Sequence, residues 1–254
     1  MLRSLNDIED YKVHATDGGI GSVSDFYFDD HDWTVRYLAV ETGGFWEGPS
    51  RVLVSPIAFG EAKWETRRFH LTISRDKVRN SPLLARDAPL SRQYEDAYHQ
   101  YYGWPSYWGG GGAWGAWGSP GLLADKNWVQ SVTKDVDHEH HLRKIGEVLG
   151  CRIHGSDAVI GVVKDFIVDD ESWIIRYMVV DTGSWWAERN VILATHWIGR
   201  IDDRDEMVHV DLLRETIKKS PEWSPEQPVN RDYEARLFDY YGRPVYWAED
   251  KRHV

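Results

Sequence analysis

Short runs of alternating apolar and polar residues, separated by turn-forming residues, occur twice along the chain. The first set of runs is Tyr11–Ala15, Ile20–Phe28, Trp33–Glu41, Arg51–Val54, Ala58–Trp64 and Arg68–Ile73. In the last run Phe69, Leu71 and Ile73 share one face, which is the period-two pattern of a half-buried strand. The sequence therefore predicts six short strands in each set, joined by turns such as Asp17-Gly18-Gly19.

The two sets belong to one long internal repeat. Residues 20–40 read IGSVSDFYFDDHDWTVRYLAV and residues 160–180 read IGVVKDFIVDDESWIIRYMVV. The offset is 140 residues, and it becomes 139 after Trp46 and Trp186. Solenoid units span only about 20–50 residues, so a repeat of this length indicates two copies of a whole domain. We therefore predict domains at 1–108 and 142–254, joined by a linker at 109–141.

Helix signals follow the strands of each copy. One helical turn is predicted at Arg75–Asn80 and at Arg214–Lys219. A longer helix is predicted at Arg92–Tyr102, with Ser91 as its N-cap and Gly103 as its C-terminal cap, and Asn230 and Gly242 take these places in the second copy. In the first copy its apolar face is predicted to hold Tyr94, Ala97, Tyr98 and Tyr101. In the second copy the face is predicted to hold Tyr233, Leu237, Tyr240 and Tyr241. The expected fold is mainly β: two small six-stranded β-barrels, each followed by a short C-terminal helix.

The shared motif resembles the PRC-barrel family. It reads Ile-Gly-x-Val-x-Asp-Phe, then two aspartates, then Trp-x-x-Arg-Tyr-x-x-Val, at residues 20–40 and 160–180. The resemblance covers about residues 2–80 and 142–219. The family includes the cytoplasmic part of the H subunit of bacterial photosynthetic reaction centres and the C-terminal domain of the ribosome-maturation factor RimM. The resemblance implies a six-stranded barrel and no common active site. From this sequence we expect neither a transmembrane helix like that of the H subunit nor a separate N-terminal domain like that of RimM.

Charge and composition narrow the class of partner. The formal net charge is −11, and no basic field is visible that could neutralise phosphates, so direct nucleic-acid binding is not expected. No apolar run is long enough to span a bilayer, and the first residues lack the apolar stretch of a signal peptide. The single cysteine, Cys151, excludes an intramolecular disulfide and is expected to be a buried small hydrophobe. We expect a bacterial, cytoplasmic protein.

Several polar groups could carry chemistry. The loop carboxylates Asp29, Asp30, Asp32, Asp169 and Asp170 are weak candidates for a hard cation, but the EF-hand pattern is absent and aspartate is common in turns. Asp181-Thr182-Gly183-Ser184 has the local pattern of aspartic proteases. The first copy has Glu41 at that place, which would spoil a symmetric carboxylate pair, so a strand-ending turn is favoured.

Histidines and arginines give further candidates. The tract Asp135–His141 could bind a transition metal, although a solvated connector is favoured. His14 and His70 have the counterparts His154 and His209, and we expect them to serve as hydrogen-bonding or interface residues. Arg36 and Arg176 are expected to pair with Asp25 and Asp165.

The tryptophans provide the candidate interaction residues. The segment GGGGAWGAWGSPG opens the linker, and its tryptophans are expected to be at least partly buried, because exposed tryptophan is costly. The interaction candidates are Trp46, Trp104, Trp114, Trp117, Trp185, Trp186, Trp197 and Trp223.

No nucleophile–base pair, phosphate loop or dinucleotide fingerprint is present, so neither catalytic residues nor cofactors are expected. We predict a non-enzymatic protein-interaction or scaffold module whose repeats pair about a pseudo-two-fold axis. The alternatives are a soluble relative of reaction-centre H-type subunits that supports electron or proton transfer, a factor in ribosome or RNA processing, and a small-ligand-binding barrel.

Overall fold

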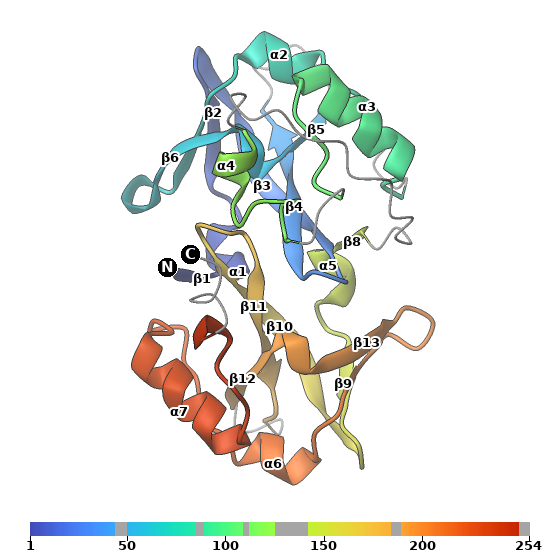
Figure 1. Cartoon of the computed structure of the whole chain (residues 1–254), viewed down its shortest axis with the longest axis vertical. Helices are drawn as coiled ribbons and strands as arrows, with labels where there is room; N and C mark the ends of the chain where they lie inside the picture. Colours follow the sequence, from blue (N-terminus) through green and yellow to red (C-terminus); the bar gives the residue numbers. More distant parts are fainter. Residues whose placement is uncertain (44–49, 85–88, 109–111, 125–141, 184–188, 249–254) are drawn as a thin grey trace. The chain divides into compact units, whose positions relative to one another are not determined.

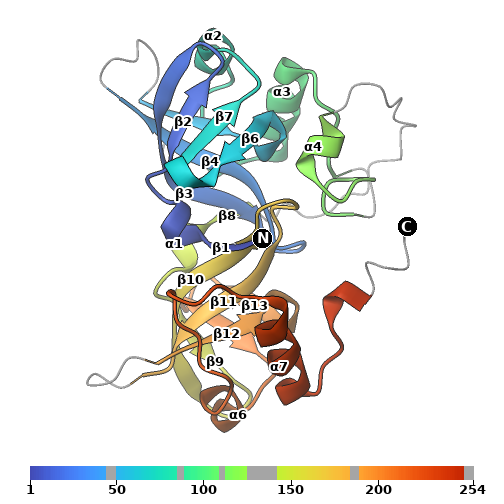
Figure 2. The same ribbon diagram turned by 90° about the vertical axis from the view of Figure 1, so that its left-hand side faces the viewer.

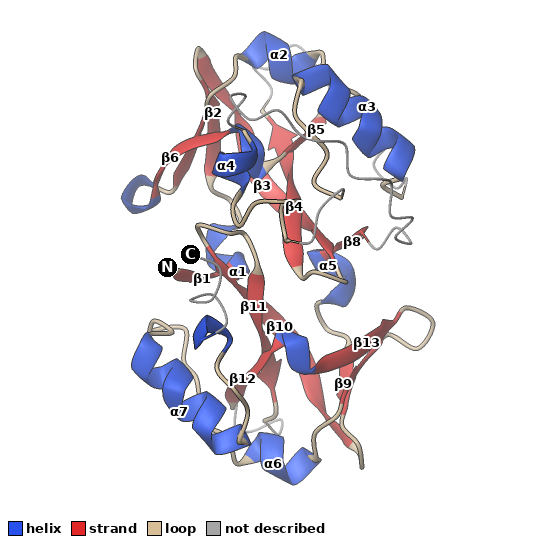
Figure 3. Cartoon of the chain, in the orientation of Figure 1, coloured by secondary structure: helices blue, strands red, loops and turns tan. Residues whose placement is uncertain are grey.

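The structure is a computed structural model of the 254-residue chain. It describes every residue except 44–49, 85–88, 109–111, 125–141, 184–188 and 249–254. Strands predominate in both repeats (Figure 3). The chain forms two compact units. We call them the N-unit (Asn6–Glu147 and Asp169–Ile175) and the C-unit (Met1–Leu5, Val148–Val168 and Arg176–Val254).

The N-unit contains a seven-stranded sheet. Its strands are β2 (Lys12–Ala15), β3 (Gly18–Asp29), β4 (Thr34–Thr42), β5 (Arg51–Val54), β6 (Phe59–Lys63), β7 (Arg68–Leu71) and β8 (Leu142–Lys144). The strand order is β5-β4-β3-β2-β7-β6, and β8 joins alongside β3. Only the β2–β7 pair is parallel among these pairings. The six predicted strands of the first copy are confirmed.

A glycine determines how closely β3 and β4 approach. A Cβ atom built on Gly21 would lie 1.9 Å from the carbonyl oxygen of Glu41, and one on Gly161 would lie 1.9 Å from that of Asp181. No side chain fits at that distance, so a close backbone approach explains the Ile-Gly dipeptide of both copies.

The C-unit contains the matching sheet of the second repeat. Its strands are β1 (Leu2–Ser4), β9 (Arg152–His154), β10 (Val159–Asp169), β11 (Ile175–Asp181), β12 (Asn190–Ala194), β13 (Ile198–Asp202) and β14 (Met207–Val210). The order β12-β11-β10-β9-β14-β13 repeats that of the N-unit, and β1 pairs with β10. The two copies thus share one topology, as the internal repeat predicts.

Each sheet takes one strand from the other repeat. Strand β1 opens the first repeat but pairs with β10, whereas β8 opens the second repeat but pairs with β3, with Phe28 opposite Arg143. This exchange raises the strand number from the predicted six to seven. Neither strand order closes on itself, because β5 and β6 end one and β12 and β13 end the other.

The N-unit also receives a loop from the second repeat. Residues Asp169–Ile175 belong to this unit, and Trp173 is buried against Phe59 and Phe69, with ring centroids 5.3 and 5.8 Å apart. The Trp173 carbonyl accepts from the Val35 amide at 2.8 Å. A strand and a buried tryptophan of the second repeat therefore complete the core of the N-unit.

The helices are short. They are α1 (Leu5–Ile8), α2 (Arg75–Arg79), α3 (Arg92–Tyr102), α4 (Pro120–Leu123), α5 (Ile145–Val148), α6 (Arg214–Lys218) and α7 (Arg231–Tyr241), with 3-10 turns η1 (Pro56–Ala58), η2 (Trp64–Thr66), η3 (Thr195–Trp197) and η4 (Tyr246–Ala248). The predicted bounds of α3 and the N-caps Ser91 and Asn230 are confirmed. Gly103 and Gly242 adopt the left-handed conformation of C-terminal caps, at φ 72° and 61°.

The buried face of α3 differs from the predicted one. Helix α3 lies over the N-unit sheet (Figure 1) and buries Glu95, Tyr98, His99 and Tyr102, whereas Ala97 is exposed. In α7 the buried residues are Tyr233, Glu234, Leu237 and Phe238. The predicted face was displaced because a glutamate and a histidine were counted as solvent-facing. Both occupy the apolar side of the helix.

Within the part of the chain that the structure describes, no helix combines the length and the apolar character needed to cross a membrane.

Candidate functional site

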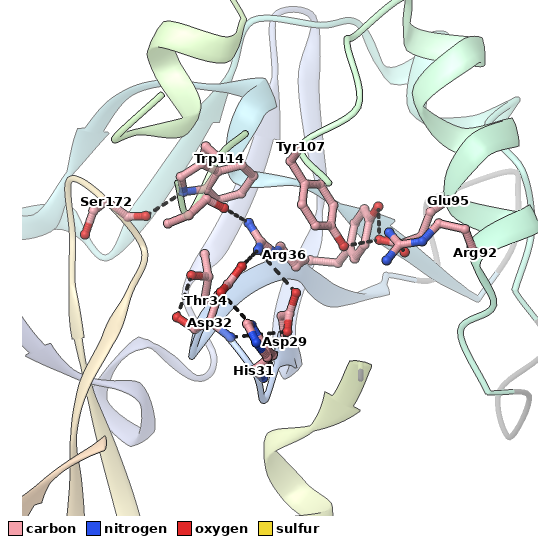
Figure 4. Close-up of polar contacts among 12 residues, drawn as sticks. Asp29, His31, Asp32, Thr34, Arg36, Arg92, Glu95, Tyr107, Trp114 and Ser172 are labelled. Atoms are coloured by element: carbon pink, nitrogen blue, oxygen red, sulfur yellow. Dashed lines mark hydrogen bonds and ion pairs between the residues drawn. The ribbon is translucent and has the colours of Figure 1, made fainter. Parts of the chain in front are cut away.

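Glu95 is the centre of a buried polar cluster beneath α3. One carboxylate oxygen accepts hydrogen bonds from the Tyr37 hydroxyl on β4 at 3.0 Å and from the Tyr107 hydroxyl at 2.5 Å (Figure 4). The other accepts from the Arg92 guanidinium at 2.8 Å. Glu95 is 0% exposed, so these donors replace the water that the charge loses on folding. The cluster ties the helix and the chain after it to the sheet.

The C-unit contains the same cluster. The carboxylate of Glu234 accepts from the Tyr177 hydroxyl at 2.6 Å and from the Tyr246 hydroxyl at 2.7 Å, and Arg231 pairs with it at 3.1 Å. These residues occupy the repeat positions of Tyr37, Tyr107, Glu95 and Arg92. Because both copies keep the whole arrangement, it belongs to the shared scaffold.

The tyrosines of the clusters remain protonated hydrogen-bond donors. Burial, followed by the Glu95 carboxylate, raises the pKa of Tyr37 well above its ordinary value, and the same two causes raise the pKa of Tyr107. Burial and Glu234 raise the pKa of Tyr177 in the same way. These hydroxyls hold their protons through the neutral pH range, which suits anchoring and not proton transfer.

Arg36 extends the cluster in the N-unit. It is 1% exposed and lies over the Tyr107 ring, with its guanidinium carbon 3.8 Å from the ring centroid. Its terminal nitrogens bond the Ala113 carbonyl and pair with Asp29 at 3.3 Å and Asp32 at 3.4 Å (Figure 4). The expected pairing with Asp25 is wrong, because Arg36 lies at the loop end of β4, while Asp25 lies opposite Ala39 farther along the strand pair.

Asp25 and Asp165 instead bind the segments that are exchanged between the repeats. Asp25 accepts from the backbone amides of Phe26 at 2.7 Å and Gly146 at 3.2 Å. Burial raises its pKa, and these two amides partly oppose the shift. In the C-unit, Asp165 accepts from the amide of Phe166 at 2.7 Å and from the Ser4 hydroxyl. The repeated Asp-Phe dipeptide thus anchors the chain that enters from the other repeat.

A folded glycine–tryptophan segment, residues 112–118, covers Arg36. Reciprocal backbone hydrogen bonds join Gly112 to Gly115 and Trp114 to Trp117. Gly115 has φ 71°, and a Cβ there would lie 3.1 Å from the Tyr107 carbonyl oxygen, so only glycine fits without strain. The segment is therefore an ordered turn. In Figure 2 it leads into α4, which packs against η1.

Trp114 is the centre of this cover. It is 0% exposed, its indole N–H donates to the Ser172 carbonyl at 2.6 Å, and its ring lies 5.1 Å from the Arg36 guanidinium carbon (Figure 4). Arg36 therefore contacts the rings of both Tyr107 and Trp114, an arrangement that suits the flat, weakly hydrated guanidinium. In the C-unit the counterpart Arg176 lies 4.3 Å from the Tyr246 ring centroid and is half-buried.

His99 is a second feature of the N-unit alone, since Phe238 takes its place in α7. Its Nδ1 lies 2.8 Å from the Pro105 carbonyl oxygen and must carry the proton, because a carbonyl only accepts. Its Nε2 is buried without a hydrogen-bond partner. Burial lowers the pKa of His99 to about 4, although the Pro105 carbonyl and Glu95 oppose this shift. The imidazole is therefore neutral at neutral pH.

The carboxylates predicted as cation ligands form hydrogen bonds and ion pairs with other groups of the protein. Asp29 and Asp169 accept backbone amides two and three residues ahead and so close their loops. Asp30 pairs with Arg143, and Asp32 pairs with Arg36. The described residues hold no group of three or more histidine, cysteine or acidic side chains placed to bind a metal. Asp170 stays a candidate from sequence alone.

The Asp181-Thr182-Gly183 sequence forms a turn. The Asp181 carboxylate accepts from the Gly183 amide at 2.8 Å, and the Thr182 hydroxyl donates to the Arg189 carbonyl. Both contacts are local bonds of a strand end, as the turn interpretation predicts.

The candidate tryptophans fall into three groups. Trp114, Trp197 and Trp223 are buried, at 0%, 6% and 6% exposed, and so present little surface to a partner. Trp104 and Trp117 are half-buried and keep an accessible edge. The remaining candidates, Trp46, Trp185 and Trp186, lie outside the described residues. Among the candidates that the structure describes, Trp104 and Trp117 are therefore the ones with surface left for a partner.

Sequence reasoning missed Glu95 and Glu234. A charged residue on a helix is usually solvent-facing, which hides its role. Two signals could have revealed it: the glutamate occurs at the same place in both helices, and each copy has an arginine three residues before it and a Pro-x-Tyr-Trp tail after it.

Comparison with known proteins agrees with the fold. A family model described as PRC-barrel domain matches residues 2–78. These residues form a PRC-barrel domain. The C-unit has the same strand order, although the model match lies in the first repeat. A protein of Deinococcus radiodurans, described as uncharacterised, is 35% identical over 74 residues. That match spans 29% of this chain and 26% of the relative, so it compares one domain of each protein.

Proposed function

We propose that the chain is a non-enzymatic protein-interaction module built from two PRC-barrel repeats. The proposal rests on the contacts that the polar side chains make within the two units. The buried glutamates, together with the tyrosine and arginine side chains that bond them in both copies, anchor the helix to the sheet. The copies do not share the glycine–tryptophan segment that covers Arg36 in the N-unit. A feature found in one copy is not required by the fold, so we assign specific recognition to this segment.

The partner surface is assigned to the N-unit. Trp104 stacks on the buried Tyr102 ring, with centroids 4.4 Å apart, and keeps an accessible edge. Trp117 is half-buried in the glycine–tryptophan segment, and Leu122 on α4 is 57% exposed. Aromatic rings held rigidly by the protein lose little conformational entropy on binding, so they are effective anchors for a partner protein.

A ligand-binding barrel receives less support. A pocket lined by Tyr27, Arg51, Leu53 and Leu83 has a volume of about 10 Å³, which is room for about one water molecule. Tyr37 and Leu38, which point to opposite faces of β4, are both fully buried. Within the described ranges, these two observations do not favour a small ligand.

The test is affinity capture with the full chain, read by mass spectrometry of proteins from the native cell. We expect at least one enriched protein that is lost in a W117A/L122S variant. The control is L213S, which removes an exposed leucine of the C-unit (54% exposed). If the W117A/L122S variant captures the same proteins as the unchanged chain, the partner surface lies elsewhere. If no protein is enriched by the unchanged chain, the proposal of an interaction module loses its support.

A further inference from the structure

Each unit has a pair of histidines side by side on its parallel strand pair. His14 on β2 lies opposite His70 on β7, and His154 on β9 lies opposite His209 on β14. The ring centroids are 5.8 Å apart in both pairs, and the planes cross at 38° and 42°. Residues in direct register on neighbouring strands place their side chains next to each other, so the geometry follows from the sheet itself.

The four rings are accessible and make no competing bonds. All four are half-buried, and in the described part of the chain no hydrogen bond or ion pair joins their nitrogens to other groups. Of the two expected roles, hydrogen bonding is therefore not seen among the described residues, and the interface role stays a prediction.

The pairs persist although their surroundings differ. Gly19 lies opposite His14, while Val159 lies opposite His154. The position two residues before the second histidine is Arg68 in one copy and Met207 in the other. The neighbouring residues differ between the copies, whereas both histidines are present in each copy. This difference indicates that the imidazoles themselves are required.

We propose that each pair is a binding site for one divalent transition-metal ion, such as Zn²⁺, Ni²⁺ or Cu²⁺. Neutral imidazole suits these ions, whereas Mg²⁺ and Ca²⁺ require oxygen ligands. Two imidazoles bound to one tetrahedral ion at metal–nitrogen distances of about 2.0–2.1 Å have ring centroids roughly 5 Å apart. The observed centroid separation of 5.8 Å is close to this value in both pairs.

The site has two protein ligands, because the described residues hold no group of three ligand-type side chains. The remaining coordination positions are therefore open to water or to a ligand from another molecule. Such a site binds metal reversibly and differs from a closed structural zinc site. It also goes beyond the interaction function proposed above and does not depend on it.

The test counts bound ions by isothermal titration with Zn²⁺. The starting chain carries H138A/H140A/H141A, which removes the separate histidine tract of residues 135–141. We expect two ions per chain, one after His70→Gln or His209→Gln, and none after both. The control, His31→Ala, removes an exposed histidine away from the pairs and should leave two ions. Far-UV circular dichroism confirms that each variant is folded.

Two results would overturn the proposal. One is that the starting chain, folded and free of the tract, binds no Zn²⁺. The other is that binding persists unchanged when both His70→Gln and His209→Gln are present.

Discussion

The backbone amide of Gly146, at the start of the second repeat, donates a 3.2 Å hydrogen bond to the Asp25 carboxylate of the first repeat. Next to it, β8 pairs with β3, and Arg143 pairs with Asp30. The C-unit holds its incoming strand in a related way, since Ser4 donates to Asp165. The aspartate of the Asp-Phe motif thus helps to fix the exchanged segment in both units.

Replacing this aspartate should weaken the N-unit. Asp25→Ala leaves the amides of Phe26 and Gly146 without their acceptor, which we expect to reduce the free energy of unfolding by about 1–3 kcal/mol. Urea unfolding monitored by tryptophan fluorescence measures the change. Asp7→Ala is the control, because the pair that Asp7 forms with Arg67 is exposed, and it should change stability by less than about 1 kcal/mol. Equal effects of the two variants would contradict the anchoring role.

The isolated first repeat should form a dimer. A chain of residues 1–108 retains β1 but has lost both β10 and β8, so β3 has an open position of the kind that β8 fills in the full chain. We expect β1 of one copy to pair with β3 of another, which is the exchange of identical elements that generates swapped dimers. Light scattering after size-exclusion chromatography measures the mass. Arg3→Pro, which removes a strand amide, should shift the population toward monomer. A monomer at all concentrations would contradict this prediction.

Removing the buried glutamate should be costly in either unit. Glu95→Ala leaves the Arg92 charge and the hydroxyls of Tyr37 and Tyr107 without their acceptor, and we expect a loss of about 3–5 kcal/mol in the free energy of unfolding. Glu95→Gln keeps a carbonyl acceptor and should cost less. Glu234→Ala provides the matched variant in the C-unit. Chemical unfolding curves compare the three, and a loss below about 1 kcal/mol for Glu95→Ala would show that the cluster does not anchor the helix.

His99 should make the stability of the N-unit depend on pH. Its pKa is lowered from 6.5 to about 4 in the folded chain, so between these values the unfolded chain binds a proton that the folded chain does not. Stability is therefore full above about pH 6.5 and falls as the pH drops toward 4, by about 3 kcal/mol if His99 acts alone. His99→Phe, which copies Phe238 of the other repeat, should remove this part of the pH dependence. Thermal melts at pH 7.0, 5.5 and 4.5 compare the two chains, and identical pH profiles would refute the assignment.

Much of the fold was predictable because its signals are local. Strand β5 at Arg51–Val54 and helix α3 at Arg92–Tyr102 match the predicted bounds, since period-two alternation, Ser91 and Gly103 act within a few residues. The exchange of β1 and β8 was not predictable. Each is three residues long without alternation, and its choice of partner depends on tertiary packing.

The candidate site was harder to predict for a related reason. The face of α3 was displaced by one position because Glu95 and His99 were counted as polar, whereas in the folded chain one is paired and the other is neutral. The true partners of Arg36 include the Ala113 carbonyl, seventy-seven residues away, which no local pattern specifies. The histidine pairs could be aligned from the repeat, but their contact required the parallel register of β2 and β7.

The crossed placement of β1 and β8 has a consequence for how the two halves can change over time. A dimer of two separate copies that exchange strands dissociates when it is diluted. Because one gene encodes both copies, every substitution occurs in both of them. On a single polypeptide the strand exchange is intramolecular and does not depend on protein concentration. Each half can then acquire its own loops and surface residues while the other preserves the framework. The glycine–tryptophan segment, which the described residues show only beside the first repeat, is an asymmetry that such a union permits.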